Sequence, residues 1–155
     1  MSKNSDDKLK AANSAELRYV PYEDQDKSSY LLAIRQLISK DLSEPYSIYV
    51  YRYFLYQWGD LCFMVRSSNN LFIETFPLTL WQTLDGDDNL VGVIVCKLEP
   101  HRGGPRRGYI AMLATQQSHR GQGIATKLVR MAVDKMIEND ADEVNSPREQ
   151  LHGLY

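Results

Sequence analysis

The residues of this chain that could do chemistry gather in a short glycine-rich turn between a strand-like run and a helix-like run. The turn reads Arg120-Gly121-Gln122-Gly123-Ile124-Ala125. Glycines at a strand-to-helix turn let the backbone fold tightly, so that several consecutive amides face one anion while the helix dipole favours its negative charge. Arg120 would add a cation, and the small side chain of Ala125 would let a ligand approach the first helical turn. The pattern therefore predicts a pyrophosphate-binding site.

Three other interpretations of the same glycines compete with this one. A P-loop needs a GK[ST] ending, which the turn lacks. The dinucleotide-binding fingerprint belongs to a parallel βαβ unit, whereas an antiparallel hairpin is expected before this turn. An isolated GxG is most often only a tight turn. Here the preceding strand, the arginine and the small residue together give the pattern RxxGxA, which favours the anion site.

The elements that must hold this turn in place are predicted from the spacing of the apolar residues. Residues 17–22 alternate weakly, as an edge strand does. Residues 28–42 predict a helix that a serine can cap. Its apolar face is formed by residues at three-to-four spacing, namely Leu31, Ile34, Ile38 and Leu42. Residues 46–58, which are rich in tyrosine and end at Gly59, favour a second helix, although their β-branched and aromatic content would also suit a strand.

The second half of the chain predicts a hairpin and the helix that follows the glycine-rich turn. Residues 90–98 are typical of a central strand, and residues 108–115 of the strand that returns antiparallel beside it. The helix over 124–139 is supported by apolar residues at helical spacing, namely Ile124, Leu128, Met131, Met136 and Ile137. Shorter strands are expected over 61–65 and 142–144.

One globular domain accounts for the length and composition of the chain. It has 155 residues, of which 43% are hydrophobic and 25% are charged, and this is enough to bury a core. Residues 1–16 predict a disordered tail, residues 17–144 the domain, and residues 145–155 a divergent tail. Residues 67–88 start as a loop and continue as an apolar run without a clean period, which indicates an atypical insertion.

The charge balance and the cysteines exclude several classes of protein. A net charge of -2 argues against a broad basic face for nucleic acid. Cys62 and Cys96 lie in apolar runs without metal-ligand spacing, which predicts buried, reduced thiols and no metal site. The polar start does not resemble a signal peptide, and no apolar run is long enough to span a membrane. We therefore expect a soluble, cytoplasmic protein that binds neither nucleic acid nor membrane.

Longer stretches around these motifs resemble one family. The run RxxGxA after a strand of this type is similar to the acetyl-CoA pyrophosphate loop of GNAT acetyltransferases. Three stretches are similar to the catalytic subunits of NatC, an N-terminal acetyltransferase complex of that superfamily: KDLSEPYSIYVYRYFLY (40–56), GVIVCKLEPHRGGPRRGYIAMLAT (92–115) and HRGQGIATKLVRMAVDKM (119–136). The resemblance covers most of residues 17–144, apart from the insertion.

The resemblance implies a GNAT acyl-CoA N-acyltransferase fold of the α/β (α+β) type, with a mixed, mostly antiparallel sheet flanked by helices. In such a fold the strand carrying Met112, Leu113 and Ala114 splays from its neighbour and pairs with the pantetheine arm of acetyl-CoA. The backbone amide of Leu113 or Ala114 would polarise the thioester carbonyl during catalysis. The pyrophosphate would be held by the whole loop, namely Arg120, Gly121, Gln122, Gly123, Ile124, Ala125 and Thr126.

The resemblance also implies a substrate and partners. The reaction would transfer acetyl from acetyl-CoA to the α-amine of an N-terminal methionine that a hydrophobic residue follows. The first residues of this substrate would lie in a channel shaped by Leu42, Glu44, Pro45, Tyr46 and Tyr109, and Tyr109 would also have a catalytic role. The partners would be the N-termini of nascent proteins and the auxiliary subunits of a NatC complex, through which the chain would reach the ribosome.

The chain departs from this family in two places. The resemblance stops after Val144, so the family's C-terminal strands and fourth helix, with a glutamate expected to act as base and a tyrosine near the thiol, are missing from the matched part. The insertion over 67–88 is longer and more hydrophobic than the usual link. Two alternatives therefore stay open: a catalytically inactive module that binds CoA or the NatC subunits, and a phosphate-binding domain unrelated to acetyl transfer.

Overall fold

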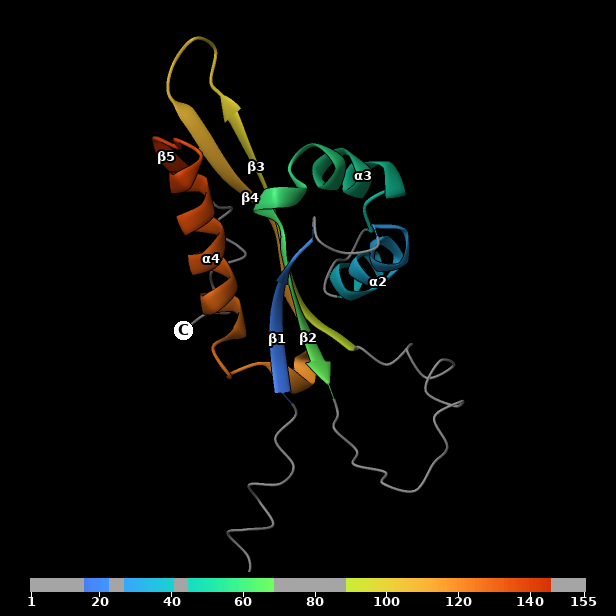
Figure 1. Cartoon of the computed structure of the whole chain (residues 1–155). Coiled ribbons are helices and arrows are strands. Elements are labelled where there is room, and N and C mark those ends of the chain that lie inside the picture. The colour runs from blue at the N-terminus through green and yellow to red at the C-terminus, as the bar shows by residue number, and fades with distance from the viewer. Residues whose placement is uncertain (1–15, 23–26, 41–44, 69–88, 146–155) are drawn as a thin grey trace, which may run out of the picture.

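The computed structural model describes residues 16–22, 27–40, 45–68 and 89–145 of the chain. They form a five-stranded sheet with helices α2 and α3 on one face and α4 on the other (Figure 1). The strands are β1 (Glu16–Pro21), β2 (Phe63–Ser68), β3 (Asn89–Pro100), β4 (Arg106–Thr115) and β5 (Glu143–Asn145). The helices are α2 (Lys27–Ser39), α3 (Ile48–Gln57) and α4 (Ile124–Glu138), with the short 3₁₀ turns η1 (Gly59–Leu61) and η3 (Gln117–His119).

The sheet is mixed and mostly antiparallel, as the sequence predicted. Its strand order is β1-β2-β3-β4-β5, in which the first three pairings are antiparallel and β4 pairs with β5 in parallel. The predicted edge strand is β1, and the predicted hairpin is β3–β4, which extends beyond the other strands (Figure 1). β5 pairs with β4 only over Arg107, Gly108 and Tyr109. Within the described residues, the rest of β4 therefore has no strand beside it on that edge.

β4 carries an extra residue in its pairing with β3. Val95 lies opposite Met112 and Cys96 lies opposite Ile110, so Ala111 is the additional residue on β4. A bulge of this kind bends its strand and increases the local twist. The bend lies just beyond the last pair between β4 and β5, and the open edge of β4 runs from there to the turn that begins α4.

The face of the sheet beneath α2 and α3 holds one of two apolar clusters. Leu31, Ile34 and Ile38 are buried in it, which confirms three of the four residues predicted for the apolar face of the first helix. The fourth, Leu42, lies outside the described residues. None of the helices that the structure describes is both long and apolar enough to cross a membrane.

The other face of the sheet is covered by α4. The predicted core residues Ile124, Leu128 and Met136 are buried there. Two predicted members of this apolar face are not in the core, because Ile137 is 61% exposed and Met131 is only half-buried. Ala132 is buried instead. The prediction favoured the larger side chains, whereas the close contact between helix and sheet selects a small one at this position.

Cys62, just before β2, and Cys96, in β3, are buried free thiols, as predicted. The amide of Cys96 donates a hydrogen bond to Sγ of Cys62 at 3.4 Å. Burial raises the pKa of the Cys62 thiol to about 12, and it also raises the pKa of Cys96 well above its ordinary value. Both thiols therefore stay protonated and unreactive at neutral pH.

The tyrosine-rich segment forms helix α3, so the helix is correct and the strand alternative is wrong. It ends at Gln57, where the amide of Trp58 donates to the carbonyl of Phe54 at 2.9 Å. The α-helix therefore stops just before Gly59, as predicted, although Gly59 does not adopt the left-handed conformation of a glycine cap and instead begins η1. A Cβ at Gly59 would stand 3.3 Å from the ring of the buried Tyr22, so this glycine permits a close approach between two segments.

Strand β2 is longer than predicted and shifted toward the C-terminus. It begins at Phe63, because Leu61 belongs to η1, and it continues through Ser68. The sequence predicted a loop from Ser67, but Ser67 is buried and pairs with Leu17 of β1. Cross-strand pairing thus overrides the turn preference of serine. The rest of the predicted insertion and both predicted tails lie outside the described residues, apart from a few residues at their edges.

Candidate cofactor and substrate site

The predicted anion site lies in the turn between β4 and α4. β4 ends at Thr115, η3 follows, and Gly123 is the N-cap of α4. Gly121 and Gly123 have φ angles of 76° and 75°, in the left-handed region that glycine adopts at no steric cost. In the part of the chain that the structure describes, no atom would lie within 4 Å of a Cβ at either glycine. The two glycines therefore fold the turn and leave open space in front of it.

The backbone amides of this turn point to a ligand site. The amide of Arg120 donates to the carbonyl of Gln117 at 3.3 Å, and the amide of Lys127 donates to the carbonyl of Gly123 at 3.0 Å. Between these two bonds, in the part of the chain that the structure describes, no backbone carbonyl accepts from the amides of residues 121–126. Amides at a helix N-terminus that lack an intrahelical partner carry partial positive charge and attract anions.

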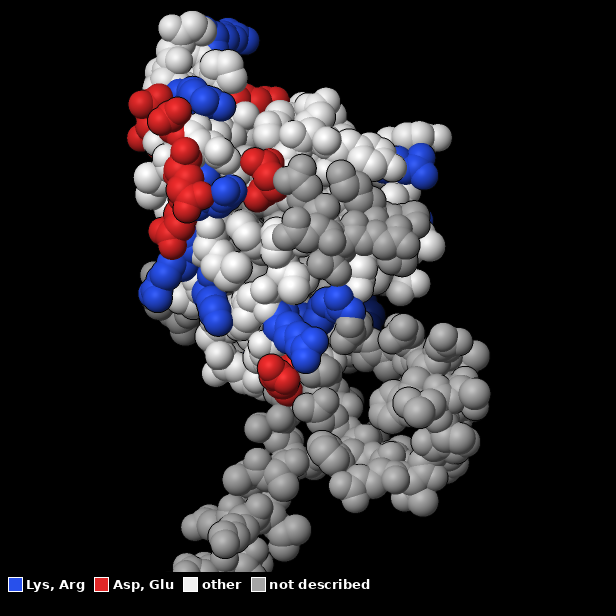
Figure 2. All heavy atoms as spheres, in the orientation of Figure 1, with Lys and Arg blue, Asp and Glu red and all other residues white. Residues whose placement is uncertain are grey.

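The charges along α4 favour an anion at its N-terminal end. Its first half carries two basic residues and no acidic one, Lys127 and Arg130, whereas its second half carries Asp134 and Glu138 together with one basic residue, Lys135. Figure 2 shows the same separation on one face of the molecule, with carboxylates gathered toward the end of α4 near β5 and basic residues toward the other end. The helix dipole alone would favour the opposite placement. This arrangement therefore supports a site for negative charge beside the turn.

A hollow of about 560 Å³ adjoins the turn. Its described lining comes from the end of α2, the end of β4 and the link to α4, namely Leu37, Lys40, Thr115, Gln116, Gln117 and Ser118. Nε of Arg120 donates to the carbonyl of Thr115 at 3.3 Å, which ties the turn to the end of β4. The buried hydroxyl of Thr115 has no hydrogen-bond partner among the described residues. The hollow thus suits an elongated polar ligand that runs from β4 toward the turn.

The open edge of β4 presents the amide of Leu113. The amide of Gln116, just after β4, donates to the carbonyl of Val91 in β3 at 2.7 Å. In an antiparallel pair, successive residues alternate between bonding the neighbouring strand and facing away from it. Ala114 lies two residues before Gln116 and therefore also faces β3, whereas Leu113 faces the open edge. Sequence reasoning left both amides as candidates, and the pairing distinguishes them.

Tyr109 lies on the other side of the bulge, on the sheet face that α3 covers. It is half-buried against the apolar cluster beneath α2 and α3, and it lines a second hollow of about 270 Å³. Tyr46 is 43% exposed and packs edge-on against Tyr51, with ring centroids 6.4 Å apart. Pro45 is exposed beside it. The two remaining predicted substrate residues lie outside the described residues, namely Leu42 and Glu44.

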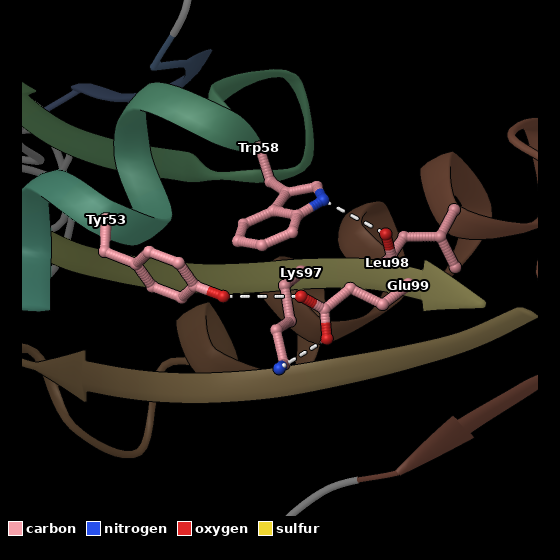
Figure 3. A network of polar contacts seen from close by, with 5 residues as sticks. All are labelled: Tyr53, Trp58, Lys97, Leu98 and Glu99. Atoms are coloured by element: carbon pink, nitrogen blue, oxygen red, sulfur yellow. Dashed lines mark hydrogen bonds and ion pairs between the residues drawn. The ribbon is translucent and has the colours of Figure 1, made fainter. Parts of the chain in front are cut away.

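A polar network beside the second hollow was missed by sequence reasoning (Figure 3). Nζ of Lys97 forms an ion pair with Glu99 at 2.7 Å, and the hydroxyl of Tyr53 donates to the other carboxylate oxygen at 3.3 Å. The indole N–H of Trp58 donates to the carbonyl of Leu98 at 3.0 Å. The network ties the end of α3 to β3. Its signal in the sequence is the alternation Lys-Leu-Glu, which places both charges on one face of an otherwise apolar strand.

The described residues contain no cluster of His, Cys, Asp and Glu side chains that could hold a metal ion.

Comparison with known proteins identifies the class to which this fold and site belong. Residues 31–155 match the model of the acetyltransferase (GNAT) family. The chain belongs to that family. It is 42% identical over 130 residues to N-alpha-acetyltransferase 30 of Saccharomyces cerevisiae, covering 83% of this chain and 65% of that protein. It is 46% identical over 125 residues to the Schizosaccharomyces pombe protein of the same name, covering 81% and 68%.

The chain spans only part of the length of these relatives. The match to human N-alpha-acetyltransferase 30, at 44% identity over 128 residues, covers 83% of this chain and 29% of the human protein. Among solved structures, the NatC complex bound to Gag peptide and CoA contains a similar chain, with a TM-score of 0.71, 38% identity, and coverage of 90% of this chain and 81% of that chain. Arabidopsis thaliana Naa50 bound to a bisubstrate analogue, with a TM-score of 0.61 and 18% identity over 90% and 79% of the two chains, supports the fold alone.

Proposed function

We propose that the chain is a protein N-terminal α-amino acetyltransferase of the NatC type, which transfers acetyl from acetyl-CoA to an N-terminal methionine that a hydrophobic residue follows. The observation that carries the proposal is the row of amides over residues 121–126, at the head of α4 and next to the open edge of β4. Similarity to N-alpha-acetyltransferases 30 supports this substrate class.

The residues of the turn and of β4 fit acetyl-CoA. Space in front of Gly121 and Gly123 is open, and the amides behind it can donate to the diphosphate, with Arg120 adding a positive charge. Met112, Leu113 and Ala114 would flank the pantetheine arm along the open edge. Bound there, acetyl-CoA supplies the activated acetyl group. The amide of Leu113 would donate to the acyl oxygen and stabilise the negative charge that develops on it when an amine attacks.

The peptide would approach from the side of Tyr109. The hollow of about 270 Å³ at this residue is large enough for a side chain, and Tyr53 of α3 hydrogen-bonds to Glu99 in its lining. The NatC structure that contains the similar chain is bound to a Gag peptide, which supports a peptide site in this chain as well. The candidates for binding the first substrate residues there remain Leu42, Glu44, Pro45 and Tyr46. The same structure supports auxiliary NatC subunits as partners. Ribosome contact and a cytoplasmic location are part of the proposal.

An acetylation assay tests the proposal. The full chain is incubated with acetyl-CoA and a peptide that begins Met-Leu, and the product is analysed by mass spectrometry for one added acetyl group at the α-amine. The same peptide with its N-terminus already acetylated is the control and should gain nothing. Binding of CoA without transfer would instead favour an inactive CoA-binding module. Comparable binding of CoA and inorganic phosphate would contradict the assignment of the turn to a coenzyme.

A further inference from the structure

The sheet face near α3 changes from apolar core to a polar floor at the ends of β3, β4 and β5. Lys97 of β3 lies opposite Tyr109 of β4, which lies opposite Asn145 of β5. In the next row, Glu99 lies opposite Arg107, which lies opposite Glu143. Residues directly opposite one another share a face of the sheet. We call these six residues the polar floor.

Each cation of the polar floor is paired with a carboxylate. Nζ of Lys97 lies 2.7 Å from Glu99, and Nε of Arg107 forms an ion pair with Glu143. Glu99 also accepts the hydroxyl of Tyr53 at 3.3 Å, as Figure 3 shows, which holds its carboxylate in place. The side chains of Lys97 and Glu99 are 27% and 41% exposed. The pairs are thus partly screened by protein, and the polar floor has no net charge.

The hollow beside Tyr109 has an uneven set of charges in its wall. Lys97, Arg107 and Glu99 line it together with Tyr109, and Nζ of Lys97 lies 6.0 Å from the centroid of the Tyr109 ring. Glu143 is not part of the lining. Glu99 is therefore the carboxylate that offsets the positive charge of this wall at the hollow itself.

A free N-terminus could enter this hollow only if the positive charge of its wall were balanced by a carboxylate. The α-amine of a peptide has a pKa of about 8, so most of it carries a positive charge at neutral pH. A cation entering beside an unpaired lysine would be repelled. We propose that Glu99 is a specificity-determining residue, which neutralises Lys97 so that a positively charged protein N-terminus can enter the hollow at Tyr109. The inference rests on the proposed N-terminal substrate, and it does not require that transfer occurs.

Two single variants, Glu99→Gln and Lys97→Met, and the double variant that combines them form a charge series. Glu99→Gln leaves Lys97 unpaired and should weaken binding of a free-amine Met-Leu peptide by about threefold to fivefold, the size of one charge pair about 5 Å apart in a high dielectric. Lys97→Met leaves Glu99 unpaired and should strengthen binding. The double variant removes both charges and should bind within about twofold of the unchanged chain.

The measurement is the Kd of the peptide for the CoA-bound chain, obtained by calorimetry. The N-acetylated form of the same peptide has no charge at its end, so the series should leave its Kd unchanged. Raising the pH from about 7 to about 9 deprotonates the free α-amine and should shrink the effect of Glu99→Gln. The charged and titratable groups that line the hollow are Lys97, Glu99, His101, Arg107 and Tyr109. Behind them, Tyr53 hydrogen-bonds to Glu99 and Glu143 forms an ion pair with Arg107.

A matched control is available on the opposite face of the sheet. Lys135 and Glu138 of α4 form an ion pair at 2.9 Å with side chains 39% and 64% exposed, so Glu138→Gln should change neither Kd. Three outcomes would overturn the inference. Glu99→Gln could weaken binding of the free-amine and the acetylated peptide equally, it could weaken neither, or all three variants could weaken binding of the free-amine peptide. The same holds if the unchanged chain binds CoA but no free-amine peptide. Failure of acetyl transfer with the charge series intact would contradict only the proposed enzymatic function.

Discussion

At the scale of single residues, the cofactor site depends on the backbone more than on side chains. Gly123 is both the N-cap of α4 and a residue with a φ of 75°. No side chain within 4 Å would obstruct a Cβ there, so packing does not require glycine. The requirement comes from the left-handed backbone and from the space that a diphosphate would occupy.

Gly123→Asp should abolish CoA binding. A carboxylate at this position would stand against the diphosphate, and repulsion at a partly desolvated site reduces the affinity by about 100-fold or more. Gly103, in the β3–β4 hairpin, is a matched control, because its φ is 74° and no atom lies within 4 Å of its Cβ position. Gly103→Asp has the same backbone cost and should leave the Kd for CoA, measured by calorimetry, unchanged. Equal Kd values for the two variants would contradict the phosphate site.

The sequence allowed the turn to be predicted but not the identity of the amide that faces the open edge. The glycines, the arginine and the helical periodicity that follows are all local features, so the strand-to-helix turn over residues 120–126 could be predicted and proposed as an anion site. The choice between Leu113 and Ala114 depends on which of the two amides hydrogen-bonds to β3 and which faces the open edge. This is set by the register of the two strands and by the bulge at Ala111. Lys97 and Glu99 were missed for a similar reason, since the pairing of β3 with β4 brings them beside Tyr109.

At the scale of elements, the position of α4 decides where the anion site lies. α4 crosses the sheet above Gly92 of β3, where a Cβ would stand 3.0 Å from Ile124 and 3.3 Å from Leu128. Ile124 is the first residue of α4 and directly follows the glycine-rich turn. The absence of a side chain at Gly92 therefore lets the start of the helix lie close to the sheet.

Gly92→Val should lower both stability and CoA affinity. The added methyl groups would enter space that Ile124 and Leu128 occupy, and overpacking of this kind costs about 1–3 kcal/mol of unfolding free energy. The first turn of α4 would move outward with its amides, so the Kd for CoA should rise. Combining Gly92→Val with Leu128→Ala should recover part of the lost stability in chemical denaturation. A helix that tolerates valine without loss would show that the close approach is not needed.

The elements were predicted more reliably than their ends. Strong helical periodicity located α2 and α4, and the β-branched run located β3. β2 was predicted too short at its C-terminal end because its last residues pair with β1. Its start was predicted two residues too early because Leu61 belongs to η1. The first of these errors depends on a tertiary contact that the local sequence does not indicate.

At the scale of the whole molecule, burial in the fold makes several weakly acidic groups harder to deprotonate in alkaline solution. Burial raises the pKa of the Cys62 thiol from 9.0 to about 12, and it raises the pKa of the Cys96 thiol well above 9.0. Burial also raises the pKa of the phenols of Tyr22 and Tyr51, which are 1% and 0% exposed. All four groups are neutral when protonated, and all lose this protection when the chain unfolds.

The free energy of unfolding should therefore fall in alkaline solution. Below about pH 9 the thiol of Cys62 is protonated in both states and has no effect. Between its unfolded pKa of 9.0 and its folded pKa of about 12, the unfolded chain binds fewer protons, so stability falls as the pH rises. One such group contributes up to about 1.4 kcal/mol per pH unit. Cys62→Ala should be less stable at pH 7 but show a shallower decline above pH 9 in urea unfolding, and an unchanged slope would contradict this account of the buried thiol.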